Sequence, residues 1–318
     1  MKPISLAALL SIGTLAWAQF KPVNPPPTPS NPAPTSSERG TPTFSVKVSL
    51  VRVLVSVRDA AGRVLTDLNR DDFRLLDSGV LQKISVFERN TSVPLSVAIL
   101  IDTSGSTQQD LHYEEDSVLK FLAALLHSGN PEDAFALYSF NWRITQEVDF
   151  GRSKNRAEHV LHSLHGEGGT SLYDAIYLAS DGLAQRDGRH VMIVVTDGGD
   201  TTSYKHFGDA LRAAQETDTV VYPIVVVPIE NEAGRNIGGE HALAAIAANT
   251  GGRSFNPEGF EQLDLAFADL LRELRTQYLI GYYPRNVRQE PRLFHPVQVT
   301  VPENTARVSA RSGYYDER

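Results

Sequence analysis

The pattern of apolar and polar positions changes along the chain near Pro94. Before it, apolar residues such as Phe44, Val46 and Val48 alternate with polar ones, the period of two that is typical of half-buried β-strands. Glycine-containing turns interrupt the alternation. We therefore expect residues 44–93 to be all-β, with four strands and no helix.

Continuous apolar runs replace the alternation after Pro94, and segments with helical periodicity separate them. Such runs are typical of parallel strands that helices cover on both faces. The buried strands are expected at 95–101, 134–140, 190–196 and 220–227. The helices are expected at 109–127, 154–164, 172–185, 205–216, 240–249 and 260–275. This alternation predicts an α/β domain with a doubly wound, mostly parallel, Rossmann-like sheet.

Three further strands are expected after the helix that ends near Arg275. Their sequences are TQYLIGYYP, LFHPVQVTV and ARVSARSGYY. Because three strands rarely form a stable unit alone, we expect them to pair with the strands of residues 44–93. The α/β domain, residues 94–275, would then be inserted into a small β-sandwich-like domain built from residues 44–93 and 276–318.

The first 43 residues have the composition of an export signal followed by a linker. Residues 1–18 combine a basic start, an apolar stretch and a small-x-small site ending at Ala18, as in a cleaved signal peptide. The alternative is an uncleaved anchor, although the apolar stretch is shorter than the roughly 20 residues of a membrane span. Residues 19–43 are rich in Pro, Ser and Thr and are expected to be a disordered linker. We expect a periplasmic, cell-surface or secreted protein without a membrane span after cleavage.

Composition narrows the classes of function. The chain has 30 Lys and Arg against 38 Asp and Glu, a formal net charge of −8, so nucleic-acid phosphates would repel it. It has no cysteine, which excludes disulfides, thiol catalysis and cysteine-based metal sites.

Oxygen-bearing side chains lie directly after two of the expected strands and in one glycine-rich loop. Asp102 comes directly after a buried strand and is followed by Ser104 and Ser106, Thr170 lies in the glycine-rich loop HGEGGTSLYD, and Asp197 follows the strand 190–196. The carboxyl ends of parallel strands meet at one edge of a sheet. Two carboxylates and three hydroxyls suit a hard divalent cation and leave a position for an outside carboxylate. The alternative is that Asp102 only caps the following helix.

Residues 95–275 resemble a von Willebrand factor A domain. The segment Asp102-Thr103-Ser104-Gly105-Ser106, with Thr170 and Asp197, matches that family's metal-ion-dependent adhesion site. The resemblance implies Mg²⁺, with Mn²⁺ or Ca²⁺ as alternatives, bound by the hydroxyls and, often through water, by the aspartates. It also implies a protein ligand that presents an Asp or Glu carboxylate. Gly169 and Asp200 are expected at the rim of this site.

The flanks resemble a narrower group, the secreted bacterial "VWFA-related" proteins common in acidobacteria. The segments VRVLVSVRDAAGRVLTDLNRDDFRLLDSGVLQKISVFE and YLIGYYP, VQVTV and VSARSGYY carry this likeness. It covers nearly all of the expected mature chain.

Enzymatic interpretations have weaker support. A strand ending in aspartate also begins haloacid-dehalogenase phosphatases, but these need a second carboxylate where this chain has Ser104. The chain has neither a GxSxG nor an HExxH motif. His159, His162 and His165 have helical spacing and are expected on a solvated helix edge, with zinc binding as the alternative. We therefore expect a non-enzymatic adhesion or protein-binding module; the alternative is an envelope scaffold whose metal site is structural and whose β-sandwich binds the partner.

Overall fold

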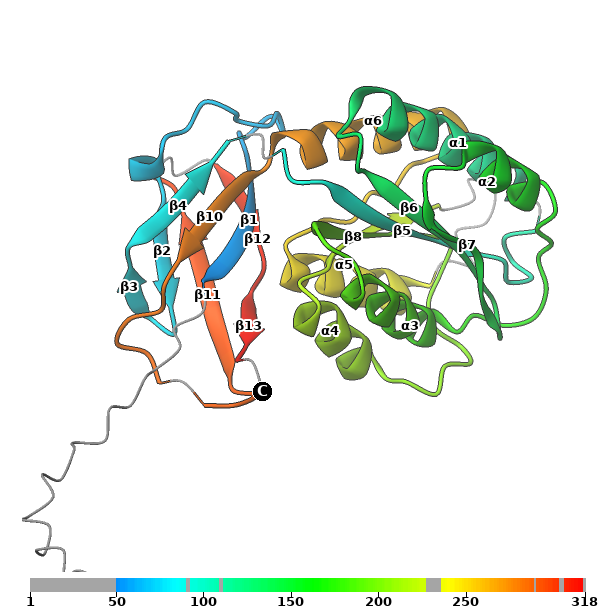
Figure 1. The fold of residues 1–318 in the computed structure, drawn as a ribbon. Helices are drawn as coiled ribbons and strands as arrows, with labels where there is room; N and C mark the ends of the chain where they lie inside the picture. Colours follow the sequence, from blue (N-terminus) through cyan, green and yellow to red (C-terminus); the bar gives the residue numbers. More distant parts are fainter. Residues whose placement is uncertain are drawn as a thin grey trace, which may run out of the picture. The chain divides into compact units, whose positions relative to one another are not determined.

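Figure 1 shows a computed structural model that describes residues 50–89, 92–108, 111–226, 236–288, 290–302 and 306–316. The expected signal peptide, the linker and residues 44–49 of the expected all-β segment lie outside these described residues.

A five-stranded sheet forms the centre of the α/β domain. Its strands are β5 (Leu95–Asp102), β6 (Ala134–Phe140), β7 (Ile144–Gly151), β8 (Arg189–Thr196) and β9 (Val220–Val225). Their order is β7-β6-β5-β8-β9, and all pairs are parallel except β6 with β7. Every residue of β5 and β6 is buried, as the continuous apolar runs predict. The predicted doubly wound sheet is confirmed.

Strand β7 was not predicted. It pairs antiparallel with β6 and forms an edge of the sheet. Its sequence ITQEVDFG has no apolar run, but Ile144, Val148 and Phe150 are buried or half-buried while Thr145 and Gln146 are exposed. Only the end of the strand alternates, with exposed Asp149 between Val148 and Phe150, and this was the usable signal for a strand with one solvent-facing side.

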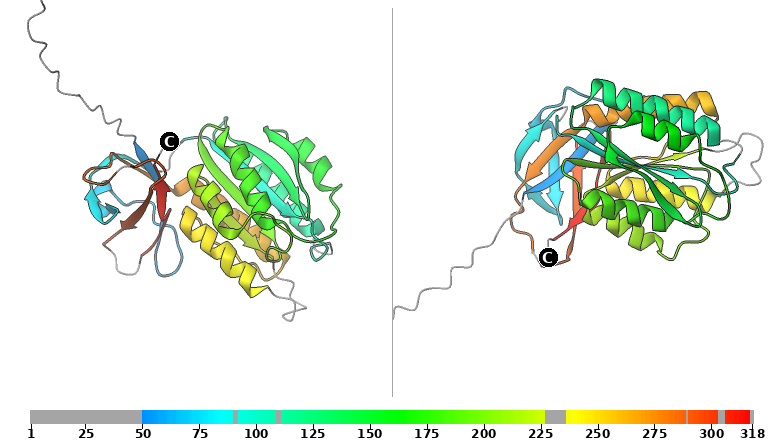
Figure 2. Two further views of the ribbon diagram at one scale, coloured as in Figure 1. Left: turned by 90° about the horizontal axis from the view of Figure 1, so that it is seen from below. Right: turned by 45° about the vertical axis from the view of Figure 1, so that its right-hand side comes forward.

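Six helices cover the two faces of this sheet. They are α1 (Leu111–Ser128), α2 (Lys154–Leu161), α3 (Leu172–Ala184), α4 (Phe207–Glu216), α5 (Ile237–Thr250) and α6 (Phe260–Thr276). Helices α1, α2 and α6 lie on one face, and α3, α4 and α5 on the other (Figures 1 and 2). On β5, Val97 and Ile99 join one apolar core and Ala98 and Leu100 the other. In the described part of the chain, no helix combines the length and apolar character that crossing a bilayer requires.

The flanking segments form two antiparallel sheets together. The strands before the α/β domain are β1 (Val51–Arg58), β2 (Arg74–Asp77), β3 (Val80–Gln82) and β4 (Ile84–Glu88). Those after it are β10 (Tyr278–Tyr282), β11 (Phe294–Thr300), β12 (Arg307–Ala310) and β13 (Gly313–Tyr315). The sheet orders are β12-β1-β10-β4 and β13-β11-β2-β3, so both flanks contribute to each sheet. The predicted pairing of the flanks is confirmed, with two differences: the last expected strand is divided into β12 and β13, and a 3-10 turn at Arg70–Asp72 interrupts a segment expected to have no helix.

A buried polar cluster lies inside the apolar core of the flanking sheets. Asp77 is fully buried and accepts hydrogen bonds from the hydroxyls of Tyr282 and Tyr314, each at 2.9 Å. Burial, and then the charge of Asp77, raises the pKa of Tyr314, so that its hydroxyl remains a donor. His295 lies between Asp77 and Asp316, with nitrogen–oxygen distances of 3.4 and 2.9 Å. The cluster thus balances a buried carboxylate of the flank before the α/β domain with donors from the flank after it.

A second buried polar cluster joins the flanking sheets to helix α6. Glu273 on α6 is fully buried and pairs with Arg58 of β1 and, at 3.0 Å, with Arg253. The hydroxyl of Tyr222 in β9 donates to Glu273 at 3.3 Å. One buried carboxylate therefore holds a strand of the flanking sheets, a loop and a strand of the central sheet.

We predict that Glu273→Gln lowers the free energy of unfolding by about 3–5 kcal/mol, because it leaves Arg58 and Arg253 without their counter-charge in a buried position. The matched control is Asp269→Asn, which removes the exposed ion pair with Arg272 on the same helix and should cost less than about 1 kcal/mol. Urea denaturation measures both. Equal losses for the two variants would contradict the role assigned to Glu273.

Candidate functional site

The carboxylate of Asp102 lies at the carboxyl end of the central strand and is completely buried. One oxygen accepts the backbone N–H of Ser104 at 2.9 Å, and the other accepts the hydroxyl of Thr196 at 2.6 Å. Thr196 is the last residue of β8. These bonds fix the orientation of Asp102 from its own loop and from the neighbouring strand.

The serine hydroxyls lie next to each other in the loop that follows. The Oγ atoms of Ser104 and Ser106 are 3.2 Å apart. Ser104 is buried and Ser106 is exposed, so the pair extends from the buried carboxylate to solvent. The Thr107 hydroxyl donates to the carbonyls of Asp102 and Ser104 at 3.0 Å and tightens the turn.

Asp102 does not cap the next helix. Helix α1 begins at Leu111, well beyond the two or three residues over which an N-cap side chain reaches. The alternative of a simple helix cap is therefore wrong, and the burial of Asp102 needs another explanation.

The loop that carries Thr170 lies between the other two loops. On one side, Gly105 donates to the carbonyl of Gly168 at 3.0 Å. On the other, the carbonyl of Thr170 accepts the N–H groups of Thr201 and Thr202 at 2.8 and 3.1 Å, and its N–H donates to the Thr201 hydroxyl at 2.7 Å. Both backbone groups of Thr170 are thus occupied, whereas its hydroxyl makes no hydrogen bond within the described residues.

Asp197 supplies the second carboxylate and is only half-buried. Burial, opposed by hydrogen bonds from Thr196 and Ser104 and reinforced by the charge of Asp197, raises the pKa of Asp102 to about 6. The charge of Asp197 thus acts on Asp102 at the same edge of the sheet. Two glycines after Asp197 let its loop approach α5: a Cβ on Gly239 would lie 2.3 Å from the Cα of Gly199.

The expected rim residues, Gly169 and Asp200, lie on the loops that hold Thr170. A Cβ on Gly169 would lie 2.7 Å from the methyl group of Thr202, so this position favours glycine. One oxygen of Asp200 accepts the N–H of Tyr173 at 3.3 Å, in the first turn of α3. Asp200 therefore links the loop after β8 to α3.

Residues that sequence reasoning missed support this arrangement. Thr196 donates a hydrogen bond to Asp102, and the hydroxyl of Thr201 accepts one from the backbone of Thr170. In the sequence, only the presence of a hydroxyl next to an expected site residue or loop pointed to these two threonines. Trp142, in the turn after β6, is 51% exposed, and a Cβ on Gly168 would lie 2.4 Å from its Cδ1 atom. An exposed indole therefore lies against the Thr170 loop, where a partner surface could contact it.

The donor set fits Mg²⁺. In an octahedral shell with bonds of roughly 2.0–2.1 Å, neighbouring ligand oxygens are about 3 Å apart, which matches the 3.2 Å separation of the Ser104 and Ser106 hydroxyls. Within the described ranges no three His, Cys, Asp or Glu side chains gather as a metal cluster; the donors around Asp102 are instead two carboxylates and several hydroxyls.

The three histidines do not share a helix. Helix α2 ends at Leu161, earlier than the expected 164, which leaves His162 at its C-cap and His165 beyond it. His162 pairs instead with Glu115 of α1 at 3.5 Å. The helical spacing on which the zinc alternative depended is therefore absent.

We predict that Thr196→Val lowers the free energy of unfolding by about 1–3 kcal/mol, because a buried carboxylate loses a hydrogen bond. Thr145→Val, on the exposed side of β7, is the isosteric control and should change stability by less than about 0.5 kcal/mol. Denaturation of the metal-free protein measures both effects. A neutral Thr196→Val variant would show that Asp102 does not depend on this bond.

Comparisons with known proteins bear on the family of this chain. The family model of the von Willebrand factor type A domain matches residues 96–269, more than half of the chain. Among curated proteins, Cuticlin-6 of Caenorhabditis elegans is 28% identical over 202 residues, which cover 62% of this chain and 33% of that protein. The match thus spans about a third of the length of that relative.

The solved structures that match this chain have low sequence identity to it. A von Willebrand factor type A structure from Catenulispora acidiphila is 12% identical and covers 86% of this chain and 76% of that chain, with a TM-score of 0.49. An aerotolerance-related membrane protein from Bacteroides fragilis is 18% identical and covers 57% of this chain and 98% of that chain, with a TM-score of 0.45.

Proposed function

Because the chain belongs to the von Willebrand factor type A family, whose domains generally bind protein partners and are not enzymes, we propose that it is an adhesion or protein-binding module that uses a metal-ion-dependent adhesion site. The residues that hold its metal, directly or through water, are Asp102, Ser104, Ser106, Thr170 and Asp197. The cation is Mg²⁺, with Mn²⁺ or Ca²⁺ as alternatives, and an Asp or Glu carboxylate of the partner completes its shell.

The observation that carries the proposal is the pair of hydroxyls 3.2 Å apart in the loop that also bonds the buried carboxylate of Asp102. Asp102 already uses both oxygens to accept hydrogen bonds, so its role fits charge compensation and orientation of water better than direct coordination. The hydroxyls of Ser104, Ser106 and Thr170 are the groups that can contact the cation.

The metal supplies positive charge and a coordination position for an incoming carboxylate. The protein's own residues place the ligands: Thr196 orients Asp102, and Thr201 holds the backbone of Thr170. The exposed Trp142 at the edge of the site adds apolar contact area for the residues beside the partner's acid. Recognition then requires both the ion and an acidic side chain.

We also propose that the protein is exported. The signal peptide expected at residues 1–18 and the linker expected at 19–43 would place the folded part in the periplasm, at the cell surface or in the medium.

The first test is metal binding. Chelator-treated protein should bind Mg²⁺ in isothermal titration calorimetry, and the double variant Ser104→Ala/Ser106→Ala should bind it at least about ten-fold more weakly, because two hydroxyl ligands are lost. Ser153→Ala is the control: this exposed serine precedes α2 and makes no capping bond. Absence of divalent uptake by the parent at millimolar concentration would refute the site.

The second test is the chemistry of the partner. Phage-displayed random peptides are selected on the protein in Mg²⁺ and eluted with EDTA. We expect enrichment of Asp or Glu, and loss of binding both in EDTA and in the Ser104→Ala/Ser106→Ala variant, with the circular dichroism spectrum unchanged. Binding that persists in EDTA would instead support the scaffold alternative, in which the metal is structural and the β-sandwich recognises the partner.

A further inference from the structure

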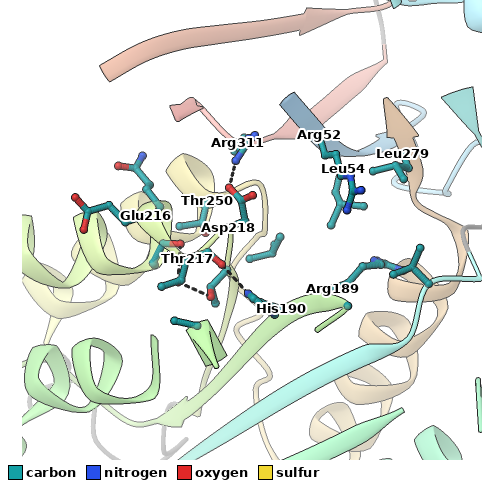
Figure 3. A pocket seen from close by; sticks show the side chains of 17 residues that line it. Arg52, Leu54, Arg189, His190, Glu216, Thr217, Asp218, Thr250, Leu279 and Arg311 are labelled. Atoms are coloured by element: carbon teal, nitrogen blue, oxygen red, sulfur yellow. Dashed lines mark hydrogen bonds and ion pairs between the residues drawn. The ribbon is translucent and has the colours of Figure 1, made fainter. Parts of the chain in front are cut away.

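A cavity of about 330 Å³ lies where the flanking sheets meet the α/β domain (Figure 3). Both belong to the compact unit Lys47–Arg318. Arg52 and Leu54 of β1 lie on one side of the cavity with Leu279 of β10 and Arg311, and Arg189 of β8 lies on the other. The volume is in the range of small-molecule sites.

Arg189 places a buried positive charge in this wall. It is 6% exposed, and its two terminal nitrogens donate to neutral acceptors, the carbonyl of Leu274 at 2.8 Å and the side-chain oxygen of Gln277. Its Nε has no partner among the described residues. Burial lowers the pKa of Arg189 to about 10, which leaves the group charged at neutral pH.

The carboxylate that acts on Arg189 through its charge, that of Asp133, is already engaged. Asp133 influences its charge but forms an ion pair with Arg275 at 2.7 Å. Arg189 thus has hydrogen-bond partners and, within the described ranges, no contacting carboxylate. A buried cation without a contacting counter-charge is costly, and an anion in the cavity would offset that cost.

Two more arginines face the same space. Arg311 pairs with Asp218 through one terminal nitrogen, while its buried Nε has no partner in the described part of the chain. Arg52 is exposed and makes no side-chain hydrogen bond or ion pair with any described residue. Asp218 is therefore the only carboxylate paired with one of these three arginines across the described ranges.

The other polar groups of the lining are occupied. Glu216 is bonded to Arg212 at 2.9 Å. Both ring nitrogens of His190 face carbonyl oxygens, of Thr217 at 2.6 Å and of Arg186 at 2.9 Å. Among the described lining side chains, the donors left for a ligand are those of Arg52 and Arg311, and Arg189 adds a buried positive charge. The cavity therefore favours an anion.

We propose that this cavity binds a small organic carboxylate. Its head group would accept hydrogen bonds from Arg52 and Arg311, whose planar guanidinium groups match a carboxylate, and the buried charge of Arg189 would attract it. Its apolar body would lie against Leu54 and Leu279. Such a ligand would contact the flanking sheets and the α/β domain at once.

The test uses the full chain in EDTA, so that it is independent of the proposed metal site. Benzoate is the probe, benzamide its uncharged counterpart, and inorganic phosphate a second anion, each titrated by calorimetry and by thermal shift. We expect benzoate to bind and to raise the melting temperature, and benzamide to do neither. Benzoate binding should also weaken as the sodium chloride concentration increases.

Variants locate the binding. Arg52→Gln and Arg311→Gln should each weaken benzoate binding at least ten-fold, and Arg156→Gln, an exposed arginine on α2, should leave it unchanged. Because Arg189 also bonds α6, its replacement could disturb folding, and the test does not depend on it. The Ser104→Ala/Ser106→Ala variant should bind benzoate like the parent.

Three results would overturn the proposal. The first is equal binding of benzoate and benzamide. The second is benzoate affinity in Arg52→Gln and Arg311→Gln equal to that in Arg156→Gln. The third is binding of phosphate but not benzoate, which would assign the cavity to inorganic anions.

Discussion

A carboxylate buried at the end of the central strand is the constraint around which the candidate site is built. Desolvation of Asp102 is unfavourable unless hydrogen bonds compensate it, and the two that do so come from Ser104 in its own loop and Thr196 at the end of β8. Both loops are therefore fixed relative to one sheet edge. The neighbouring hydroxyls of Ser104 and Ser106 gain their positions from the same arrangement.

Buried charge is used differently where the α/β domain meets the flanking sheets. There Glu273 is matched by Arg58 and Arg253, so the pairing contributes to joining the two parts. Arg189 bonds the carbonyl of Leu274, the next residue of α6, but has no acid in contact among the described residues. The charge of Glu273 is neutralised within the protein, whereas the charge of Arg189 is left for a ligand to neutralise.

The two proposed sites have opposite charge and separate supports. The site at Asp102 and Asp197 gathers acids and hydroxyls at the carboxyl ends of the strands and favours a cation. The cavity at Arg52, Arg189 and Arg311 involves the amino-terminal end of β8 and favours an anion. The two sites share no residue. Ligand binding at one site can therefore be measured in a variant that has lost the other.

The sequence by itself determined most of the elements, with strand β7 as the main exception, and the order of the site loops. Alternation before Pro94 and apolar runs after it reflect which strands are buried on one face or on both, a local property that each segment records in its own residues. Because strand ends share a sheet edge, the placement of Asp102 and Asp197 followed from order alone. Only the tertiary structure decided that Thr196 contacts Asp102 and that three arginines distant in sequence border one cavity. Such contacts depend on how separate segments pack, and the residue pattern of a single segment does not record them.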